Sequence, residues 1–275
     1  MALRSHTYIA MLVDMFGEDI VNSMLNNNFS LNSKGLSESS QEIIQNHLNM
    51  ISRKLDIDIL ETYKEWVFDF PGWVGCLDFS NGNPARELIV IGEDPHLTGN
   101  LSSFDVYCAY GMCHERVLLN ERLWQIVPYA FGHNNSINIK DNMECLKNYY
   151  ATDLCYMSPK GVSAEEKKTS VLLRKIRARI GKSFVLRQIE IIKPKYVVCN
   201  GSTSYEYLKK NIFTSCSNER KEEFTHKIRK KSVYLKAFDT DSGVIVLSFP
   251  HFTKSHNGFW NKSSKESRVL LNKLI

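Results

Sequence analysis

Four short apolar runs, each ending in small or polar residues, constrain the fold of this chain more than any other feature. They cover residues 88–91, 149–152, 196–199 and 244–247. Their apolar residues do not alternate with polar ones, which is typical of strands buried on both faces of a mainly parallel sheet. Helical stretches lie between them at 115–130, 164–180 and 183–192, and a last one near 263–274. This alternation predicts an α/β fold of three layers, α/β/α, with a central, mainly parallel sheet.

The first 85 residues have a different pattern. After a serine-rich stretch that offers an N-cap, apolar residues recur at nearly helical spacing: Ile43, Ile44, Leu48, Ile51 and Leu55. A chain of 275 residues has room for one large domain or for one domain with an appendage. We therefore expect a helical N-terminal extension over residues 1–85 and an α/β domain over residues 86–275.

Charge is divided unevenly along the chain. Residues 151–275 hold 25 Lys and Arg against 11 Asp and Glu, a net charge of +14, whereas residues 1–150 hold 10 against 19, a net charge of −9. A basic half of this strength suggests a polyanionic partner such as DNA. The alternatives are that the two halves attract each other within the fold, or that lysine-rich helix faces are simply solvated.

Cysteine usage and hydropathy bear on the compartment. Seven cysteines, an odd number, are scattered along the chain, which is typical of reduced thiols in the cytoplasm. No apolar run approaches the roughly 18 residues that a membrane-spanning helix needs. The apolar stretch at 9–13 is cut short by Asp14 and lacks a cleavage-site pattern. We expect a cytoplasmic monomer with no membrane partner.

A resident metal or small-molecule cofactor is not expected. Cys108 and Cys113 are the nearest approach to a metal motif, and no Cys-x-x-Cys pair occurs. The chain also lacks a phosphate-cradling Gly-x-x-x-x-Gly-Lys-Ser loop and a Gly-x-Ser-x-Gly nucleophile turn.

Loops at the carboxyl ends of the predicted strands carry the informative residues, because ligand sites of such sheets form there. In chain order they read Gly-Glu-Asp-Pro-His (92–96), Thr-Asp-Leu (152–154), Asn-Gly-Ser-Thr (200–203) and Phe-Pro-His-Phe-Thr (249–253), followed by Asn-Gly-Phe-Trp (257–260). This order resembles the uracil-DNA glycosylase superfamily over residues 86–275. That family has a Gly-Gln-Asp-Pro-Tyr or Gly-Glu-Ala-Pro-Gly loop, an Asn that reads the base, a Gly-Ser or Gly-Ala turn and a His-Pro-Ser loop.

The resemblance implies a DNA glycosylase, a hydrolase that flips a base out of the duplex and excises it. Breaking an N-glycosidic bond leaves positive charge on the sugar and negative charge on the base, so the site needs an anion and a hydrogen-bond donor. By resemblance, Asp94 supplies the anion and orients the water, and His251 donates to the departing base. Tyr107 or Tyr110 stacks on the base. The alternatives are that Asp94 only forms a turn before a proline, that His251 is a surface loop residue and that the tyrosines belong to the core.

Two departures from the family pattern concern the base. Asp153 stands where the family commonly has Asn; an ionised Asp only accepts hydrogen bonds, so it fits the amino group of cytosine better than O4 of uracil. His96, after Pro95, stands where a bulkier Tyr excludes C5 substituents. Together they predict a 5-modified cytosine, such as a hydroxymethylated or glycosylated base of phage DNA, and a role in antiviral defence. The alternative is uracil, with Asp153 packing elsewhere.

The resemblance also indicates contacts to the DNA backbone. Gly201, Ser202 and Thr203 lie where a turn leads into a helix, and the exposed N–H groups of such turns bind phosphate. Lys254 and Ser255 extend the fourth loop, and Phe252 is the candidate wedge. Two other classes remain open: a noncatalytic DNA-binding module with the same fold, and a hydrolase of free nucleosides, which would not need the basic half.

Overall fold

The computed structural model describes residues 7–26, 36–70, 72–73, 87–93, 104–108, 122–135, 149–163, 166, 170–226, 231–250 and 268–275. Its N-terminal part is helical, with α1 (Thr7–Phe16), α2 (Glu18–Leu25), α3 (Glu38–Leu55) and α4 (Ile59–Thr62). The Ser37 side chain caps α3 by accepting a hydrogen bond from the Ser40 amide, and α3 ends at Asp56 with φ 53°. The helix expected from the serine-rich stretch onwards is therefore confirmed.

A seven-stranded mixed sheet forms the centre of the molecule. Its strands stand in the order β2 (Gly72–Trp73), β5 (Tyr149–Asp153), β3 (Leu88–Gly92), β7 (Tyr196–Asn200), β10 (Ile245–Phe249), β9 (Lys231–Thr240) and β8 (Cys216–His226). The four middle strands from β5 to β10 run parallel, and β2, β9 and β8 pair antiparallel at the edges. All four strands predicted from the sequence are thus neighbours in one sheet.

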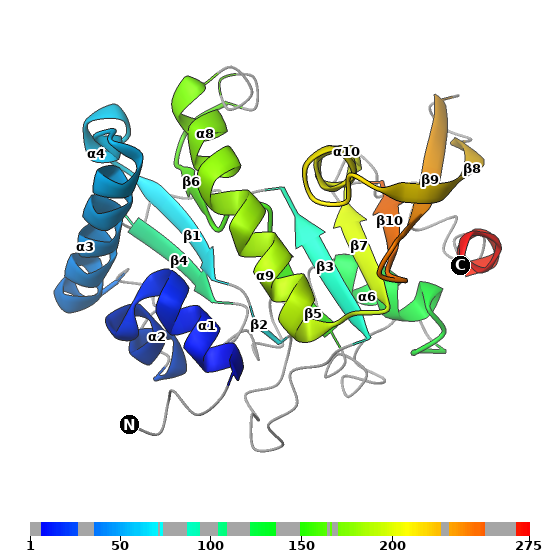
Figure 1. Cartoon of the computed structure of the whole chain (residues 1–275), viewed down its shortest axis with the longest axis horizontal. Coiled ribbons are helices and arrows are strands. Elements are labelled where there is room, and N and C mark those ends of the chain that lie inside the picture. Colours follow the sequence, from blue (N-terminus) through cyan, green and yellow to red (C-terminus); the bar gives the residue numbers. More distant parts are fainter. Residues whose placement is uncertain are drawn as a thin grey trace.

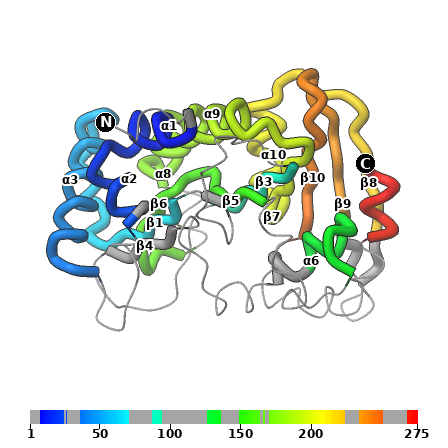
Figure 2. The backbone as a smooth tube through the Cα atoms, turned by 90° about the horizontal axis from the view of Figure 1, so that it is seen from below, coloured from blue at the N-terminus to red at the C-terminus, as the bar shows by residue number. Residues whose placement is uncertain are grey.

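Helices cover both faces of this sheet, so the predicted three-layer architecture is confirmed. Alternate residues of β3 point to opposite sides: Ile89 and Ile91 join the core under α1, α9 (Lys182–Ile192) and α10 (Ser202–Asn211), whereas Leu88 and Val90 pack with α6 (Arg122–Ala130) and the C-terminal helix over 268–274. In Figure 2, α1 and α9 lie on one side of the sheet and α6 on the other. Burial on both faces explains why the strand lacks polar alternation.

One helical prediction needs correction. Instead of two helices over 164–180 and 183–192, α8 (Val171–Ile176) continues through a π-helical turn (η5, Arg177–Gly181) directly into α9. Gly181 has helical backbone angles, φ −59° and ψ −42°, so it does not end the helix. We call residues 177–181 the π turn.

A second sheet joins the N-terminal part to the rest of the chain. β1 (Trp66–Phe70) lies between β4 (Phe104–Cys108), with which it runs parallel, and β6 (Met157–Pro159), with which it runs antiparallel. Figure 1 shows β1 and β4 beside the N-terminal helices. These strands and β2 were not expected from the sequence. Because β1 and β2 lie within residues 1–85, this part of the chain is not helical throughout. The division at residue 85 remains a prediction.

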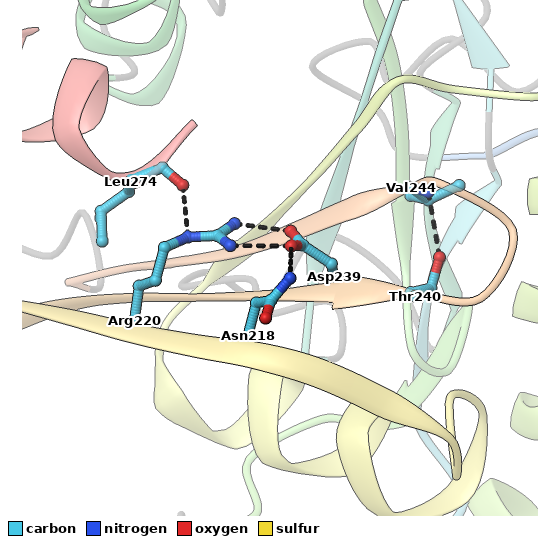
Figure 3. A network of polar contacts seen from close by, with 6 residues as sticks. All are labelled: Asn218, Arg220, Asp239, Thr240, Val244 and Leu274. Atoms are coloured by element: carbon cyan, nitrogen blue, oxygen red, sulfur yellow. Dashed lines mark hydrogen bonds and ion pairs between the residues drawn. The ribbon is translucent and has the colours of Figure 1, made fainter.

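A polar network fixes the C-terminal helix to the β8–β9 hairpin (Figure 3). The guanidinium of Arg220 donates to both carboxylate oxygens of Asp239, at 2.8 and 2.6 Å, and its Nε donates to the carbonyl of Leu274 at 2.7 Å. Asn218 adds a hydrogen bond to the same carboxylate, and the hydrogen bonds from Arg220 and Asn218 lower the pKa of Asp239. The last residues of the chain are thereby tied to the sheet.

Candidate functional site

The carboxyl ends of the four parallel strands meet at one edge of the main sheet. Gly92 pairs in register with Asp153, and Asn200 pairs with Phe249. The arrowheads of β3 and β7 in Figure 1 point to this edge. Because neighbouring strands are about 4.8 Å apart, the ends of β3 and β10, with β7 between them, are separated by about 10 Å. The ends of the strands that precede the predicted site residues therefore lie at this edge.

Asp153 lies directly against Gly92. A Cβ atom at position 92 would collide with Oδ1 of Asp153 and would lie 3.1 Å from its Cγ. The amide of Leu154 also donates to the carbonyl of Gly92 at 3.0 Å. The Asp153 side chain is half-buried at the edge of the sheet. Its close contact with the Gly92 backbone determines where the carboxylate lies. This is the one predicted base-reading residue whose side chain the structure describes.

The turn after β7 is held by the end of β10. Gly201 has φ 106°, a conformation that favours glycine, and its buried amide donates to the carbonyl of Phe249 at 2.9 Å. Ser202 and Thr203 follow as the exposed first residues of α10. The structure thus brings the three predicted phosphate-binding residues to the same edge as Asp153.

Sequence reasoning missed an ion pair at this edge. Oε1 of Glu93, the residue after Gly92, lies 3.4 Å from Nη2 of Arg177, and the two side chains are 32% and 17% exposed. Asn200, at the end of β7, is a further polar residue of the edge. The available signal for Glu93 was its position between Gly92 and Asp94, whereas no motif pointed to Arg177.

The remaining predicted site residues lie outside the described part of the chain: Asp94, Pro95, His96, Tyr110, His251, Phe252, Lys254 and Ser255. Asp94 follows Gly92 by two residues in the sequence, and His251 follows Phe249 by two. Tyr107 belongs to β4, where its backbone is in register with Asp69 of β1, and its side chain also lies outside the description. The roles of all these residues stay predictions.

Within the described ranges, no group of three or more His, Cys, Asp or Glu side chains could hold a metal ion. Cys155, Cys199 and Cys216 are free thiols, and burial raises the pKa of Cys199, which makes this thiol a poor nucleophile or ligand. In the same part of the chain, no helix combines the length and the apolar character needed to cross a membrane.

A family model, that of the uracil DNA glycosylase superfamily, matches residues 79–274. The matched region includes every strand of the main sheet except β2, as well as the π turn and the C-terminal helix. A comparison with curated proteins gave no match.

Proposed function

Because this chain belongs to the uracil DNA glycosylase superfamily, we propose that it is a DNA glycosylase that removes a 5-modified cytosine, such as glucosylated hydroxymethylcytosine. Water would hydrolyse the N-glycosidic bond and leave an abasic site and the free base. Bases of this kind mark foreign DNA, so the activity would suit a role in defence against phage.

Asp153 is the observation that carries the choice of base. Its carboxylate lies against Gly92 at the end of β3, at the edge where the matched family implies the base pocket. A carboxylate accepts hydrogen bonds from the N4 amino group of cytosine, whereas it repels O4 of uracil. Asp153, whose carboxylate has only acceptor atoms, would therefore recognise the base.

Asp94 and His251 would carry out the bond cleavage. Asp94 would orient the water and stabilise the developing charge on the sugar, and a neutral His251 would donate a hydrogen bond to the departing base. Support for this assignment comes from the strand order, because the strands preceding these residues are separated only by β7. This strand order would let both residues act on one nucleotide.

Three further groups would complete the site. Tyr107 or Tyr110 would stack on the extruded base, and Pro95 and His96 would leave room at C5 for the substituent. Gly201, Ser202 and Thr203 would bind phosphate, with Lys254 and Ser255 nearby on the fourth loop, and Phe252 would enter the space left by the base. The net charge of +14 over residues 151–275 supports a polyanionic substrate.

A base-release assay tests the proposal directly. Oligonucleotides would carry uracil, cytosine, 5-hydroxymethylcytosine or its glucosylated form, as single strands and duplexes, with alkali to reveal abasic sites. We expect release of a modified cytosine by the native protein and none by Asp94→Asn. Asp153→Asn should lower release of the modified cytosine and raise that of uracil, because an amide can donate to O4.

Uracil is the second candidate substrate, favoured by the superfamily match itself. Release of uracil alone would keep the glycosylase assignment and exclude the modified-cytosine part. If no base were released while DNA binding remained intact, the chain would instead be a noncatalytic DNA-binding module.

A further inference from the structure

We infer that Arg177 is a positioning residue of the active site: from the π turn, it holds Glu93, the residue after β3, in the position that base release needs. The inference rests on the proposed function, because Glu93 is followed in the chain by Asp94, the proposed catalytic residue.

The ion pair between Arg177 and Glu93 is the first support. The two side chains approach to 3.4 Å, and Arg177 is only 17% exposed, so solvent screens this pair less than the surface pairs of the molecule. For comparison, the Arg187–Asp14 pair has side chains that are 46% and 59% exposed. Glu93 directly precedes Asp94 in the chain, so a change in its position is passed on to the next residue.

The π turn has contacts beyond this pair. The hydroxyl of Tyr207, on α10, donates to the carbonyl of Arg177 at 3.0 Å. A Cβ at Gly181 would lie 2.5 Å from the carbonyl oxygen of Leu154, the residue after Asp153. One turn of helix thus contacts the segments that follow β3 and β5 and the helix that follows β7. Isolated π turns within α-helices often occur at functional sites.

The competing role for Arg177 is a contact to a DNA phosphate. Arg174 and Lys175, on the same helical run, are exposed and suited to such contacts. Arg177 differs from them because it is mostly buried and has a carboxylate partner at the site edge. This difference favours positioning over phosphate binding.

The test compares Arg177→Gln and Glu93→Gln with Arg179→Gln, a control that removes the same charge from an exposed residue two positions away. Base release would be measured under single turnover at saturating protein, on the uracil and glucosylated hydroxymethylcytosine oligonucleotides. DNA affinity would be measured in parallel at several salt concentrations. The melting temperature of each variant would show whether it is folded at the assay temperature.

We expect Arg177→Gln and Glu93→Gln each to lower the maximal rate by about 10- to 100-fold, the effect of misplacing a reacting group by about 1 Å. The double variant should be no slower than the slower single variant, since both break one interaction. Arg177→Lys should recover part of the rate. DNA affinity should change no more than in Arg179→Gln, which keeps the native rate.

Several outcomes would overturn the inference. One is an unchanged maximal rate in Arg177→Gln together with weaker binding and a salt slope reduced by about one, which is the behaviour of a phosphate contact. Another is a rate loss that follows unfolding of the variant. If the native protein released neither base, the proposed function would fail and the inference with it, whereas native release with a fully active Arg177→Gln would remove the inference alone.

Discussion

At the scale of single residues, Gly92 and Asp153 share one space. The carboxylate of Asp153 occupies the position where a side chain at residue 92 would begin. We predict that Gly92→Ala displaces Asp153 and lowers release of the preferred base by roughly 10-fold or more, because a recognition group must stay within about 1 Å of its productive position. Single-turnover base release would measure the loss.

The control for Gly92→Ala is the same substitution in an Asp153→Ala background. Without the carboxylate there is nothing left to displace, so the second change should alter the rate little further. An additive loss in the double variant would mean that Gly92 acts through something other than Asp153.

His47, on α3, is a buried histidine outside the candidate site. Its Nε2 lies 2.9 Å from the hydroxyl of Tyr156, and its ring packs against Phe16 and Phe68. Burial lowers the pKa of His47 from 6.5 to about 4. Between these values the unfolded chain binds a proton that the folded chain does not, so stability falls as the pH drops from about 6.5 to about 4.

We predict that His47 accounts for a loss of about 3 kcal/mol in the free energy of unfolding between pH 7 and pH 4. Denaturant titrations at a series of pH values would measure it against His47→Gln, which keeps a hydrogen-bonding group but does not titrate. The variant should be less stable at pH 7 and lose less on acidification. Parallel pH curves for the two proteins would contradict the assignment.

At the scale of elements, a buried chain of hydrogen bonds connects three of them. Tyr150 of β5 donates to Oε1 of Gln188 on α9 at 2.7 Å, so the contact of 3.0 Å with Tyr8 of α1 has Tyr8 as donor. All three side chains are fully buried. The chain joins the first helix to the strand that ends in Asp153.

We predict that Tyr150→Phe costs more stability than Tyr8→Phe. The first change removes both the acceptor for Tyr8 and the donor for Gln188, at roughly 2–3 kcal/mol, whereas the second removes the hydrogen bond that Tyr8 donates to Tyr150, at about 1 kcal/mol. Denaturant unfolding of the two variants would compare them. Equal losses would mean that Tyr150 does not bridge the other two side chains.

The elements also show which parts of the fold were predictable. The strands β3, β5, β7 and β10 were, because a strand buried on both faces is a continuous apolar run followed by loop residues. β1, β4 and β6 were not, because none is a continuous apolar run: β1 contains Asp69, β4 contains Asp105, and β6 is only Met-Ser-Pro. The Arg177–Glu93 pair escaped prediction because its two residues are distant in the sequence, whereas Asp153 was found from its place after an apolar run.

At the scale of the whole molecule, the described N-terminal residues contribute to the core. Trp66, Phe68 and Phe70 are fully buried, and β1 occupies the middle of the second sheet. We predict that a chain consisting of residues 86–275 does not fold cooperatively, because β4 and β6 lose the strand between them. Thermal unfolding by circular dichroism, with the full chain as reference, would test this; a native-like transition would instead establish residues 86–275 as an independent domain.

The π turn has a consequence for how this protein tolerates insertions and deletions. A π-helical turn holds one residue more than an α-helical turn, so deleting Ala178 would let the helix close into regular α-helix. α8 and α9 would keep their relative orientation, because the π turn already takes up the extra residue, and the change would be confined to residues 177–181. Arg177 lies within this turn, so its closure would change the position from which the side chain reaches Glu93. The extra residue thus sets the position of a side chain at the site edge, while α8 and α9 keep their packing in the core.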